Sequence, residues 1–269
     1  MSELELERVN ENFARAAATY DHAAVLHAEV QARLLERLEL TSLQPRRILD
    51  LGTGTGRALR PLAERYPQAE VIAVDRVLPM IARARRRRWR LRRFGCAAAR
   101  AEALPFAAQS ADLVFSNLML HWSPAPEQAF TEIERMLRSR SLFLFTAFGP
   151  DTLRELRAAW SAVDGFTHVH SFEDMHNIGD ALVHAGFVEP VMDMECITLS
   201  YTQVRDLTRD LKQTGMGNVA AGRTRALTGT RRWEAMERAY ERFRVEDRLP
   251  ATYEVVYGTA WTRVRLPRR

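Results

Sequence analysis

Two kinds of residue are scarce in this chain of 269 residues: cysteine occurs twice, and lysine only at Lys212. Cys96 and Cys196 both stand in apolar or strand-like surroundings, so neither a disulfide framework nor a structural zinc site is expected. We interpret both as small buried side chains. Apart from that lysine, the positively charged side chains are all arginines, which fits a GC-rich coding sequence and by itself says nothing about partners.

Long apolar segments are absent as well. No run approaches the roughly 20 residues of a membrane-spanning helix. Residues 1–7 are acidic and lack the features of a secretory signal or an acid-poor transit peptide. Hydrophobic residues at 46% and charged residues at 27% are ordinary for a soluble globular protein. We therefore expect a cytoplasmic protein without membrane association, built on one large α/β core or on a core with a small appendage.

A glycine-rich turn at residues 52–56 is the most informative feature that is present. Residues 47–51 read as a short buried strand, and a helix is expected from about Arg57 to Arg65. Glycine permits a positive φ and close approach of a ligand, and a helix start presents free N–H groups. The turn reads G-x-G-x-G, unlike the G-x-G-x-x-G of a dinucleotide fold. Asp50, just before it, suits the ammonium group of S-adenosylmethionine better than a pyrophosphate.

The next strand supplies the second half of this pattern. Residues 70–74 form an apolar strand that ends on Asp75, which is placed to accept both ribose hydroxyls of an adenosine. A glycine turn alone fits a plain strand–helix connection equally well. Strand, glycine turn, helix, strand and terminal Asp in this order favour a class I S-adenosylmethionine-dependent methyltransferase.

Strands and helices continue to alternate along the chain. We expect helical residues at 8–40 with a break near Tyr20, and a basic helix from about Pro79 to Arg92. Further strands are expected at about 96–100, 112–116, 142–146, within 187–199 and at 251–261, and helices at about 127–137, 151–163, 174–185, 203–214 and 231–243. This order predicts an α/β fold, a Rossmann-like doubly wound and mostly parallel sheet with an antiparallel C-terminal strand and helical insertions.

We expect the chain to form a single methyltransferase domain over residues 1–269. Its expected parts are an N-terminal helical lid (1–44), a cofactor-binding core (45–149), helical insertions over the active site with a core strand near 187–199 (150–250), and a C-terminal strand and tail (251–269).

Ligands of an open α/β sheet bind at the carboxyl ends of its strands. There we expect Asp75 on the ribose, Met80 on the adenine face, and Asn117 near the sulfonium. The predicted cofactor-binding residues are Asp50, Gly52, Thr53, Gly54, Gly56, Asp75, Arg76, Met80, Ala101, Glu102, Ala103, Asn117 and Leu118.

The candidates for positioning the reactants are Tyr20 and His121. His121 and Trp122 should lie nearest the transferred methyl group, and Tyr20 belongs to the expected lid. The alternative for His121 is a polar structural histidine. The alternative for Trp122 is simple core packing instead of packing beside a cation. The alternative for the expected lid is an amphipathic surface helix. A metal site is not expected, because the residues that invite it lack a known ligand spacing. They are His168, His170 and His176.

Five segments are informative when they are taken together. They are residues 13–21 (FARAAATYD), 50–56 (DLGTGTG), 103–106 (ALPF), 116–122 (SNLMLHW) and 146–156 (TAFGPDTLREL). Together they resemble the malonyl-acyl-carrier-protein O-methyltransferase family of biotin synthesis, and the likeness continues at 174–180, 210–215 and 249–253. Two positions depart from that resemblance. Arg100 stands where an Asp is usual, and 139–141 (SRS) stands where the turn before a strand usually reads Pro-Gly-Gly.

The resemblance implies a cofactor, a substrate and a partner. The cofactor is S-adenosylmethionine, and the methyl acceptor is the free carboxylate of a malonyl thioester on acidic acyl carrier protein. The methyl ester hides the charged end, so that fatty-acid synthesis can extend the chain toward pimeloyl. A carboxylate is ionised at neutral pH, so alignment matters more than a general base. An arginine from the 150–230 region is expected to position that carboxylate.

Alternatives remain open at this stage. The same segments also resemble a mitochondrial complex I assembly factor family that hydroxylates an arginine, and a methyltransferase for another small carboxylate is a further possibility. The arginine run at 83–93 is either a solvated helix or a docking surface for an acidic partner. A catalytically silent adaptor that uses this run is the third class. We expect no nucleic acid partner and a monomer.

Overall fold

The computed structural model describes residues 4–87, 94–224 and 228–264, and the chain divides into two compact units. The first unit comprises Met1–Ala24, Phe148–Glu173 and Glu195–Val255. The second comprises Val25–Ala147, Asp174–Met194 and Val256–Arg269.

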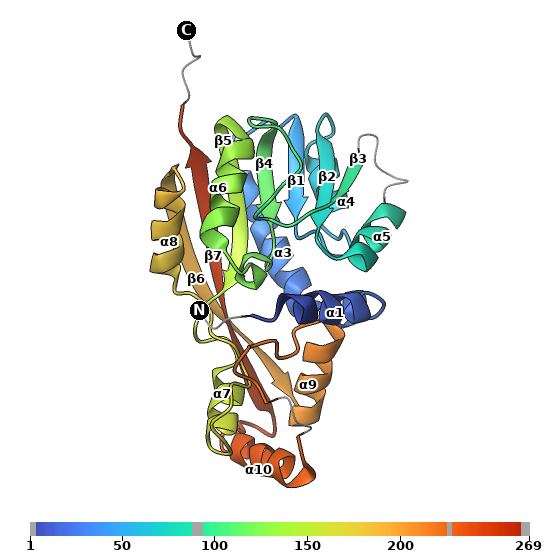
Figure 1. Ribbon diagram of the computed structural model, residues 1–269, viewed down its shortest axis with the longest axis vertical. Helices are drawn as coiled ribbons and strands as arrows, with labels where there is room; N and C mark the ends of the chain where they lie inside the picture. The colour runs from blue at the N-terminus through green and yellow to red at the C-terminus, as the bar shows by residue number, and fades with distance from the viewer. Residues whose placement is uncertain (1–3, 88–93, 225–227, 265–269) are drawn as a thin grey trace. The chain divides into compact units, whose positions relative to one another are not determined.

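A seven-stranded sheet has the strand order β3-β2-β1-β4-β5-β7-β6 (Figure 1). Its strands are β1 (Arg47–Leu51), β2 (Glu70–Asp75), β3 (Phe94–Ala98), β4 (Ala111–Ser116), β5 (Leu137–Phe148), β6 (Phe187–Tyr201) and β7 (Leu249–Thr262). The first five strands pair in parallel, and one strand of the sheet is antiparallel, so the predicted fold class is confirmed. The order reverses between β1 and β4. The carboxyl ends of these two strands therefore form the point at which such sheets bind ligands.

Helices cover both faces of the sheet, which explains why the middle residues of its central strands are mostly apolar. Ile48 and Leu49 on β1 point to opposite faces, and both are fully buried. One face packs on α6 (Pro126–Met136) and α8 (Met175–His184), with the Phe130 and Phe143 ring centroids 6.1 Å apart. Helices α3 (Val25–Arg37) and α4 (Leu59–Arg65) lie on the other face (Figure 1). Burying each large apolar side chain contributes about 1.5–3 kcal/mol, so this two-sided core holds the strand ends rigidly.

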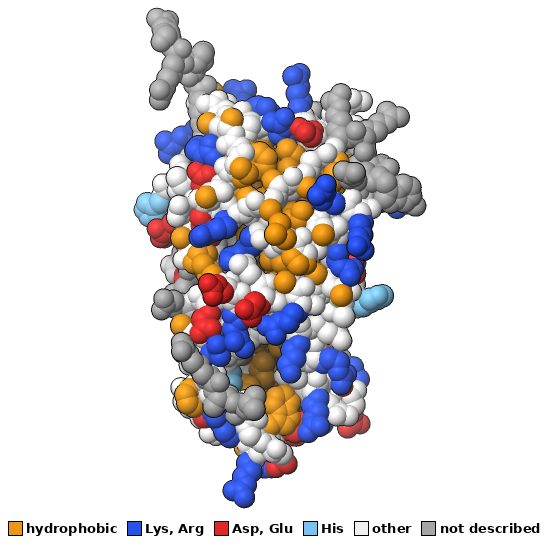
Figure 2. All heavy atoms as spheres, turned by 45° about the vertical axis from the view of Figure 1, so that its right-hand side comes forward, with side chains coloured by type: hydrophobic (Ala, Val, Ile, Leu, Met, Phe, Trp, Pro, Cys, Tyr) orange, Lys and Arg blue, Asp and Glu red, His pale blue; other side chains and the backbone are white. Residues whose placement is uncertain are grey.

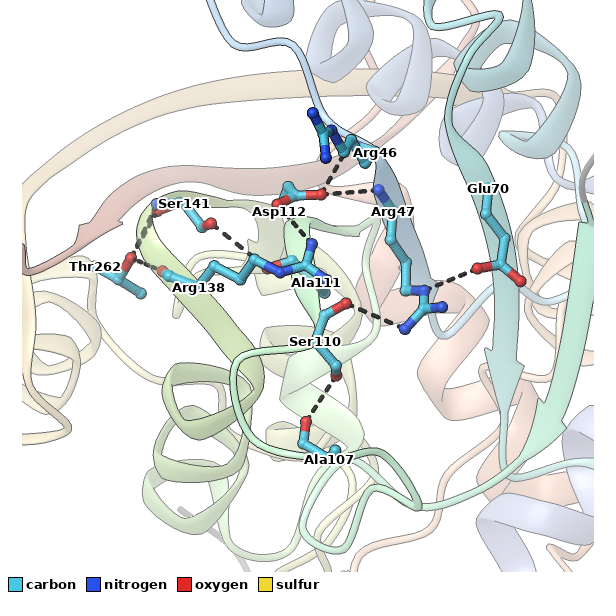
Figure 3. A network of polar contacts seen from close by, with 10 residues as sticks. All are labelled: Arg46, Arg47, Glu70, Ala107, Ser110, Ala111, Asp112, Arg138, Ser141 and Thr262. Atoms are coloured by element: carbon cyan, nitrogen blue, oxygen red, sulfur yellow. Dashed lines mark hydrogen bonds and ion pairs between the residues drawn. The ribbon is translucent and has the colours of Figure 1, made fainter. Parts of the chain in front are cut away.

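Asp112 joins the amino-terminal ends of three strands (Figure 3). One carboxylate oxygen accepts the backbone N–H groups of Arg46 and Arg47 at 2.8 and 2.9 Å, and the other accepts from the Arg138 guanidinium at 2.7 Å. Burial opposes ionisation, but these hydrogen bonds outweigh it and lower the pKa of Asp112. The starts of β1, β4 and β5 are thereby held in register, and this register fixes the positions of their carboxyl ends relative to one another.

The prediction that residues 139–141 form the turn before a strand was wrong, because they lie inside β5. Ala111 pairs with Leu137 but Leu113 pairs with Leu142, so the register shifts between them, and Arg140 has a φ of +56°. The Ser141 N–H donates to Thr262 Oγ1 at 2.9 Å (Figure 3). The segment is a bulge held by the neighbouring strand, which is why it needs no Pro-Gly-Gly.

The first unit contains the helices α1 (Leu6–Ala16), α2 (Tyr20–Ala23), α7 (Arg154–Ser161), α9 (Val204–Gln213) and α10 (Thr230–Glu241). Its N-terminal block packs on residues 213–219. The Glu5 N–H donates to the Val219 carbonyl at 2.9 Å, and Thr19 Oγ1 donates to the Gln213 carbonyl at 3.3 Å. A Cβ on Gly215 would lie only 2.7 Å from Phe13 Cδ1. That 1–44 forms a lid and that 150–250 covers the active site stay predictions.

Several predicted boundaries and one predicted environment need correction. The helical stretch 8–40 is three α-helices and a terminal 3₁₀ turn (Leu38–Leu40), interrupted at Ala17–Thr19 and again at Ala24. The strand expected at 96–100 is 94–98, and the strand material within 187–199 is one strand that extends to Tyr201. The basic helix α5 (Leu78–Arg86) ends before residues 88–93, which lie outside the described residues. Cys96 is half-buried and Cys196 is exposed, so the prediction that both are buried was wrong. Cys196 lies on β6, the edge strand of the sheet.

Candidate active site

The glycine turn follows β1 as predicted, and its glycines differ in what they face. Gly52, Gly54 and Gly56 have φ values of +74°, +53° and +82°, the left-handed region that other residues rarely adopt. A Cβ on Gly52 would lie 2.3 Å from Met119 Cγ, and one on Gly56 would lie 2.7 Å from Leu59 Cδ1. A Cβ on Gly54 would meet nothing within 4 Å among the described atoms. Packing therefore requires the outer two glycines, whereas the middle one faces open space in which a ligand can approach the backbone.

Asp75, at the end of β2, is tied to this turn. Its Oδ2 accepts the Gly54 N–H at 2.9 Å, and its Oδ1 accepts the Val77 N–H at 2.8 Å. Each carboxylate oxygen keeps a further lone pair for a hydroxyl donor. Burial raises the pKa of Asp75, whereas backbone hydrogen bonds from Val77, Gly54 and Arg76 and the charge of Arg76 oppose that rise. The carboxylate thus offers an acceptor on each oxygen, beside Gly54, to a pair of adjacent hydroxyls such as those of a ribose.

Asp50 is a buried acid at the end of β1, only 2% exposed. Its Oδ2 accepts from Thr53 Oγ1 at 2.5 Å. Burial raises the pKa of Asp50 to about 7; the Thr53 hydrogen bond opposes the rise, and the nearby charge of Asp75 adds to it. Two acids at neighbouring strand ends make this edge of the sheet a place that favours a cation, because a nearby positive charge would lower the raised pKa of each carboxyl.

The segment after β3 is held through Glu102. This side chain is 5% exposed, accepts from Ser123 Oγ, and accepts from Arg100 Nε at 3.3 Å. Gln128 Nε2 donates to the Glu102 carbonyl at 3.2 Å. Arg100, at the position where the resemblance led us to expect an Asp, is the ion-pair partner of Glu102. Ala101 is buried whereas Ala103 is exposed, so Ala103 is the alanine of this turn that an adenine would contact.

Asn117 and Leu118 are organised by Thr146 at the end of β5. Thr146 Oγ1 donates to Asn117 Oδ1 at 2.9 Å and accepts the Leu118 N–H at 2.9 Å. Asn117 Nδ2 donates to the His27 carbonyl at 3.0 Å. Leu118 has a φ of +50°. This network joins the ends of β4 and β5 to the start of α3.

The sequence analysis missed His27. Its side chain is 7% exposed, burial lowers its pKa to about 4, and the positive charge of Arg57 adds to that shift. Arg57 directly follows the glycine turn, so His27 lies near the predicted cofactor edge as a neutral imidazole. The available signal was a histidine inside the apolar stripe of a helix, between Leu26 and Val30.

The remaining predicted residues differ in burial and in the unit that holds them. His121 and Trp122 lie in a short 3₁₀ turn after β4, are 8% and 5% exposed, and have ring centroids 5.1 Å apart. Met80 is 1% exposed, and burial lowers the pKa of the half-buried Arg76. All predicted cofactor residues belong to the second unit, whereas Tyr20 belongs to the first. The roles of these residues stay predictions.

Within the described residues, no three His, Cys, Asp or Glu side chains are grouped so that they could hold a metal ion. His168 instead contacts Asp164 at 2.9 Å and stacks on Trp160 with centroids 3.8 Å apart, and His176 contacts Asp174 at 2.7 Å. No helix in the described part of the chain is long and apolar enough to cross a membrane.

Comparison with known proteins identifies the class. Residues 49–145, which include the glycine turn and Asp75, match the family described as methyltransferase domain. The structure resembles the YcgJ protein of Bacillus subtilis, with a TM-score of 0.63 and 14% identity over 88% of this chain and 100% of the other. It also resembles Haemonchus contortus phosphoethanolamine N-methyltransferase 2 in complex with S-adenosyl-L-methionine, with a TM-score of 0.51 and 18% identity over 87% of this chain and 52% of the other. The fold is therefore that of a class I S-adenosylmethionine-dependent methyltransferase.

Sequence comparison identifies the family within this class. The malonyl-[acyl-carrier protein] O-methyltransferase of Laribacter hongkongensis is 49% identical, covering 97% of this chain and 91% of its own length. The protein of the same name from Gallionella capsiferriformans is 47% identical, over 96% and 91%. The chain belongs to the malonyl-[acyl-carrier protein] O-methyltransferase family. These relatives support the O-methyltransferase prediction and not the arginine-hydroxylase alternative.

Proposed function

We propose that this protein transfers the methyl group of S-adenosylmethionine to the free carboxylate of malonyl-acyl carrier protein, in the cytoplasm. The product is the malonyl methyl ester with which the pimeloyl chain of biotin begins. The main support is likeness at 47–49% identity, over 96–97% of this chain, to relatives that carry this name. The tie between Gly54 and Asp75 adds to it, because it offers the acceptor that an adenosyl ribose needs.

Residues at the ends of β1 and β2 would hold the cofactor. Asp75 would accept the ribose hydroxyls, Gly54 would let the adenosyl group approach the backbone, and Asp50 would face the ammonium group. When bound, S-adenosylmethionine supplies an electrophilic methyl group on a positively charged sulfur. The two acids fit that cation, since each has a pKa raised by burial that a nearby positive charge would lower.

The methyl acceptor requires no proton removal, because a carboxyl with a reference pKa near 4 is ionised at neutral pH. One carboxylate oxygen would form the new bond to the methyl carbon, and the bond from that carbon to sulfur would break. The negative charge of the acceptor and the positive charge of the sulfonium disappear together, and no proton is transferred. The protein therefore acts by alignment, which can supply several kcal/mol. We assign His121 and Tyr20 to this positioning, and expect their loss to slow the reaction without abolishing it.

Helix α5 is the proposed docking surface for the acidic carrier protein. Arg85 and Arg86 are exposed on it, and basic side chains outnumber acidic ones on the face drawn in Figure 2. Opposite charges accelerate association and make it dependent on salt. Arg87 has a different role, because its Nε donates to the Thr55 carbonyl of the glycine turn at 2.8 Å. Arg90, which the sequence analysis grouped with these arginines, lies outside the described residues.

The test is transfer of labelled methyl from S-adenosylmethionine to malonyl-, succinyl- and acetyl-carrier protein. Malonyl-carrier protein should be labelled, and acetyl-carrier protein should stay unlabelled because it has no free carboxylate. Labelling of acetyl, or no labelling of malonyl by a protein that binds S-adenosylmethionine, contradicts the proposal. Preference for succinyl over malonyl would point instead to a methyltransferase for another small carboxylate.

A further inference from the structure

Arg87, at the carboxyl end of α5, is bonded to the glycine turn that follows β1. Its Nε donates to the Thr55 carbonyl at 2.8 Å, and its backbone N–H donates to the Ala84 carbonyl at 2.9 Å, which closes the helix. Arg87 is exposed as a whole, but its side-chain hydrogen bond is partly buried and Thr55 is only 1% exposed. The end of a basic helix is thereby joined to the edge at which the cofactor is proposed to bind.

Helix α5 also packs directly against this turn. A Cβ on Gly56 would lie 3.0 Å from both the Cα and the Cβ of Ala84, which is fully buried. The backbone of the turn therefore contacts the helix three residues before Arg87, and this contact brings the guanidinium within reach of the turn. The position of Arg87 is thus set by packing and not by its side chain alone.

Two other backbone groups of the turn bond to β2. The Gly52 N–H donates to the Val74 carbonyl at 2.8 Å, and the Gly54 N–H donates to Asp75 Oδ2 at 2.9 Å. Arg87 supplies a bond from a different element, 32 residues along the chain from the residue that it binds. The turn is therefore held by β2 and by α5, and a charged side chain takes part in each case. Hydrogen bonds of this kind are stronger than those between neutral groups.

The bond from Arg87 determines the orientation of a whole peptide group. The Thr55 carbonyl and the Gly56 N–H lie in one plane, because the peptide bond does not rotate freely. By holding the carbonyl, Arg87 also orients the Gly56 N–H, which donates to the Thr53 carbonyl at 2.9 Å. These bonds fix the backbone on either side of Gly54, the glycine that faces open space among the described atoms. Glycine loses more conformational freedom on ordering than any other residue, so such a turn needs them more than an ordinary one.

We propose that Arg87 is a positioning residue for S-adenosylmethionine, which orders the glycine turn before the cofactor arrives. The inference rests on the proposed function, since it concerns the cofactor of that reaction. Without Arg87 the ligand itself must order the turn, so its affinity falls while the geometry of the bound state is retained. The basic run then divides between two ligands, because Arg85 and Arg86 serve the carrier protein and Arg87 serves the cofactor.

The test compares Arg87→Met and Arg87→Lys with the matched control Arg86→Met on the neighbouring residue. Methionine keeps the aliphatic stem and removes the charge and the N–H donors, whereas lysine restores a charged donor. In calorimetric titration, the Kd of S-adenosylhomocysteine should rise about tenfold in Arg87→Met and less in Arg87→Lys, and should stay unchanged in Arg86→Met. With a small malonyl thioester, Arg87→Met should raise KM for S-adenosylmethionine in parallel and keep kcat within about twofold of the wild type.

Hydrogen exchange reports on the turn itself. In the absence of ligand, the amides of residues 52–56 should exchange faster in Arg87→Met than in the wild type. Saturating S-adenosylhomocysteine should restore their protection, because the bound ligand then orders the turn. Arg86→Met should match the wild type in both states. A residue that only stabilised the fold would change the free energy of unfolding without this local, ligand-reversible effect.

Several results would overturn the inference. One is wild-type affinity for S-adenosylhomocysteine in Arg87→Met, and another is an equal loss in Arg86→Met, because positive charge in general would then suffice. A fall in kcat at saturating cofactor with an unchanged Kd overturns it too. If Arg87→Met does not fold, Arg87→Lys must still bind the ligand more weakly than Arg86→Lys, and equal affinities overturn the inference. Failure of the wild type to methylate malonyl-carrier protein refutes the proposed function, whereas methylation together with equal ligand affinity in wild type and Arg87→Met refutes only this assignment.

Discussion

The assignment of Asp75 to the ribose is best tested by Asp75→Ala. Its carboxylate accepts the Gly54 and Val77 N–H groups at 2.9 and 2.8 Å, and we propose that its remaining lone pairs accept the ribose hydroxyls. A hydrogen bond to a charged group contributes about 1.5–3 kcal/mol, and about 1.4 kcal/mol corresponds to a tenfold change in Kd. Asp75→Ala should therefore raise the Kd of S-adenosylmethionine at least about tenfold.

Calorimetric titration of S-adenosylhomocysteine, which is chemically stable, is the appropriate measurement. Asp75→Asn serves as the matched variant, since it keeps the shape of the side chain and removes its charge. The lost Gly54 hydrogen bond is a complication, because the turn itself can shift when the carboxylate is removed.

A 2′-deoxy analogue of the ligand resolves that complication through a double-mutant cycle. In the wild type, loss of the 2′-hydroxyl should weaken binding several-fold. In Asp75→Ala the same change should have almost no effect, because the partner of that hydroxyl is already gone. Equal affinities of wild type and Asp75→Ala, or the same penalty for the deoxy ligand in both proteins, would refute the ribose assignment.

Three further results are expected. Binding of S-adenosylhomocysteine should strengthen as the pH rises from 6 toward 7.5, by about tenfold relative to pH 6, because Asp50 has a pKa of about 7 and must lose its proton to face an ammonium group; titration at several pH values measures this. Gly52→Ala should lower the free energy of unfolding by about 2 kcal/mol or more, since its φ is +74° and the new Cβ would lie 2.3 Å from Met119 Cγ; thermal and denaturant unfolding would show the loss. Replacing the exposed Arg85 and Arg86 with Glu should lower kcat/KM for malonyl-carrier protein and flatten its salt dependence in a steady-state assay, while a small malonyl thioester reacts as before.

Each of these has its own control. Asp50→Asn should abolish the pH dependence between 6 and 7.5, and an unchanged slope in that variant would assign the titration to another group. Gly54→Ala should destabilise the fold less than Gly52→Ala but impair ligand binding, because its Cβ would point into open space. Equal effects of the charge reversal on carrier protein and small thioester would show that α5 is no docking surface; Arg87 is left unchanged because it holds the Thr55 carbonyl.

The succession of strands along the chain and the glycine turn after the first of them were predictable because their signals are local. Buried parallel strands are recognisable as apolar runs, and a glycine turn after such a strand marks the edge even without tertiary information. Asp50 and Asp75 followed from their places at strand ends, and both lie there. The bulge at 139–141 was not predictable in this way, because Thr262, more than a hundred residues later, supplies the acceptor that makes a turn there unnecessary.

The sequence by itself determined the class I α/β fold, the G-x-G-x-G turn and the family, since local periodicity, backbone freedom and end-to-end likeness are properties of the chain order. Tertiary structure alone decided which glycine faces open space, that burial raises the pKa of Asp50 to about 7, and that His27 is buried near Arg57. It also decided that Arg87, within a run of arginines, donates to the Thr55 carbonyl of the glycine turn. The physical reason is the same in each case. Desolvation and hydrogen-bond partners depend on which distant segments pack around a group, and no local pattern encodes them.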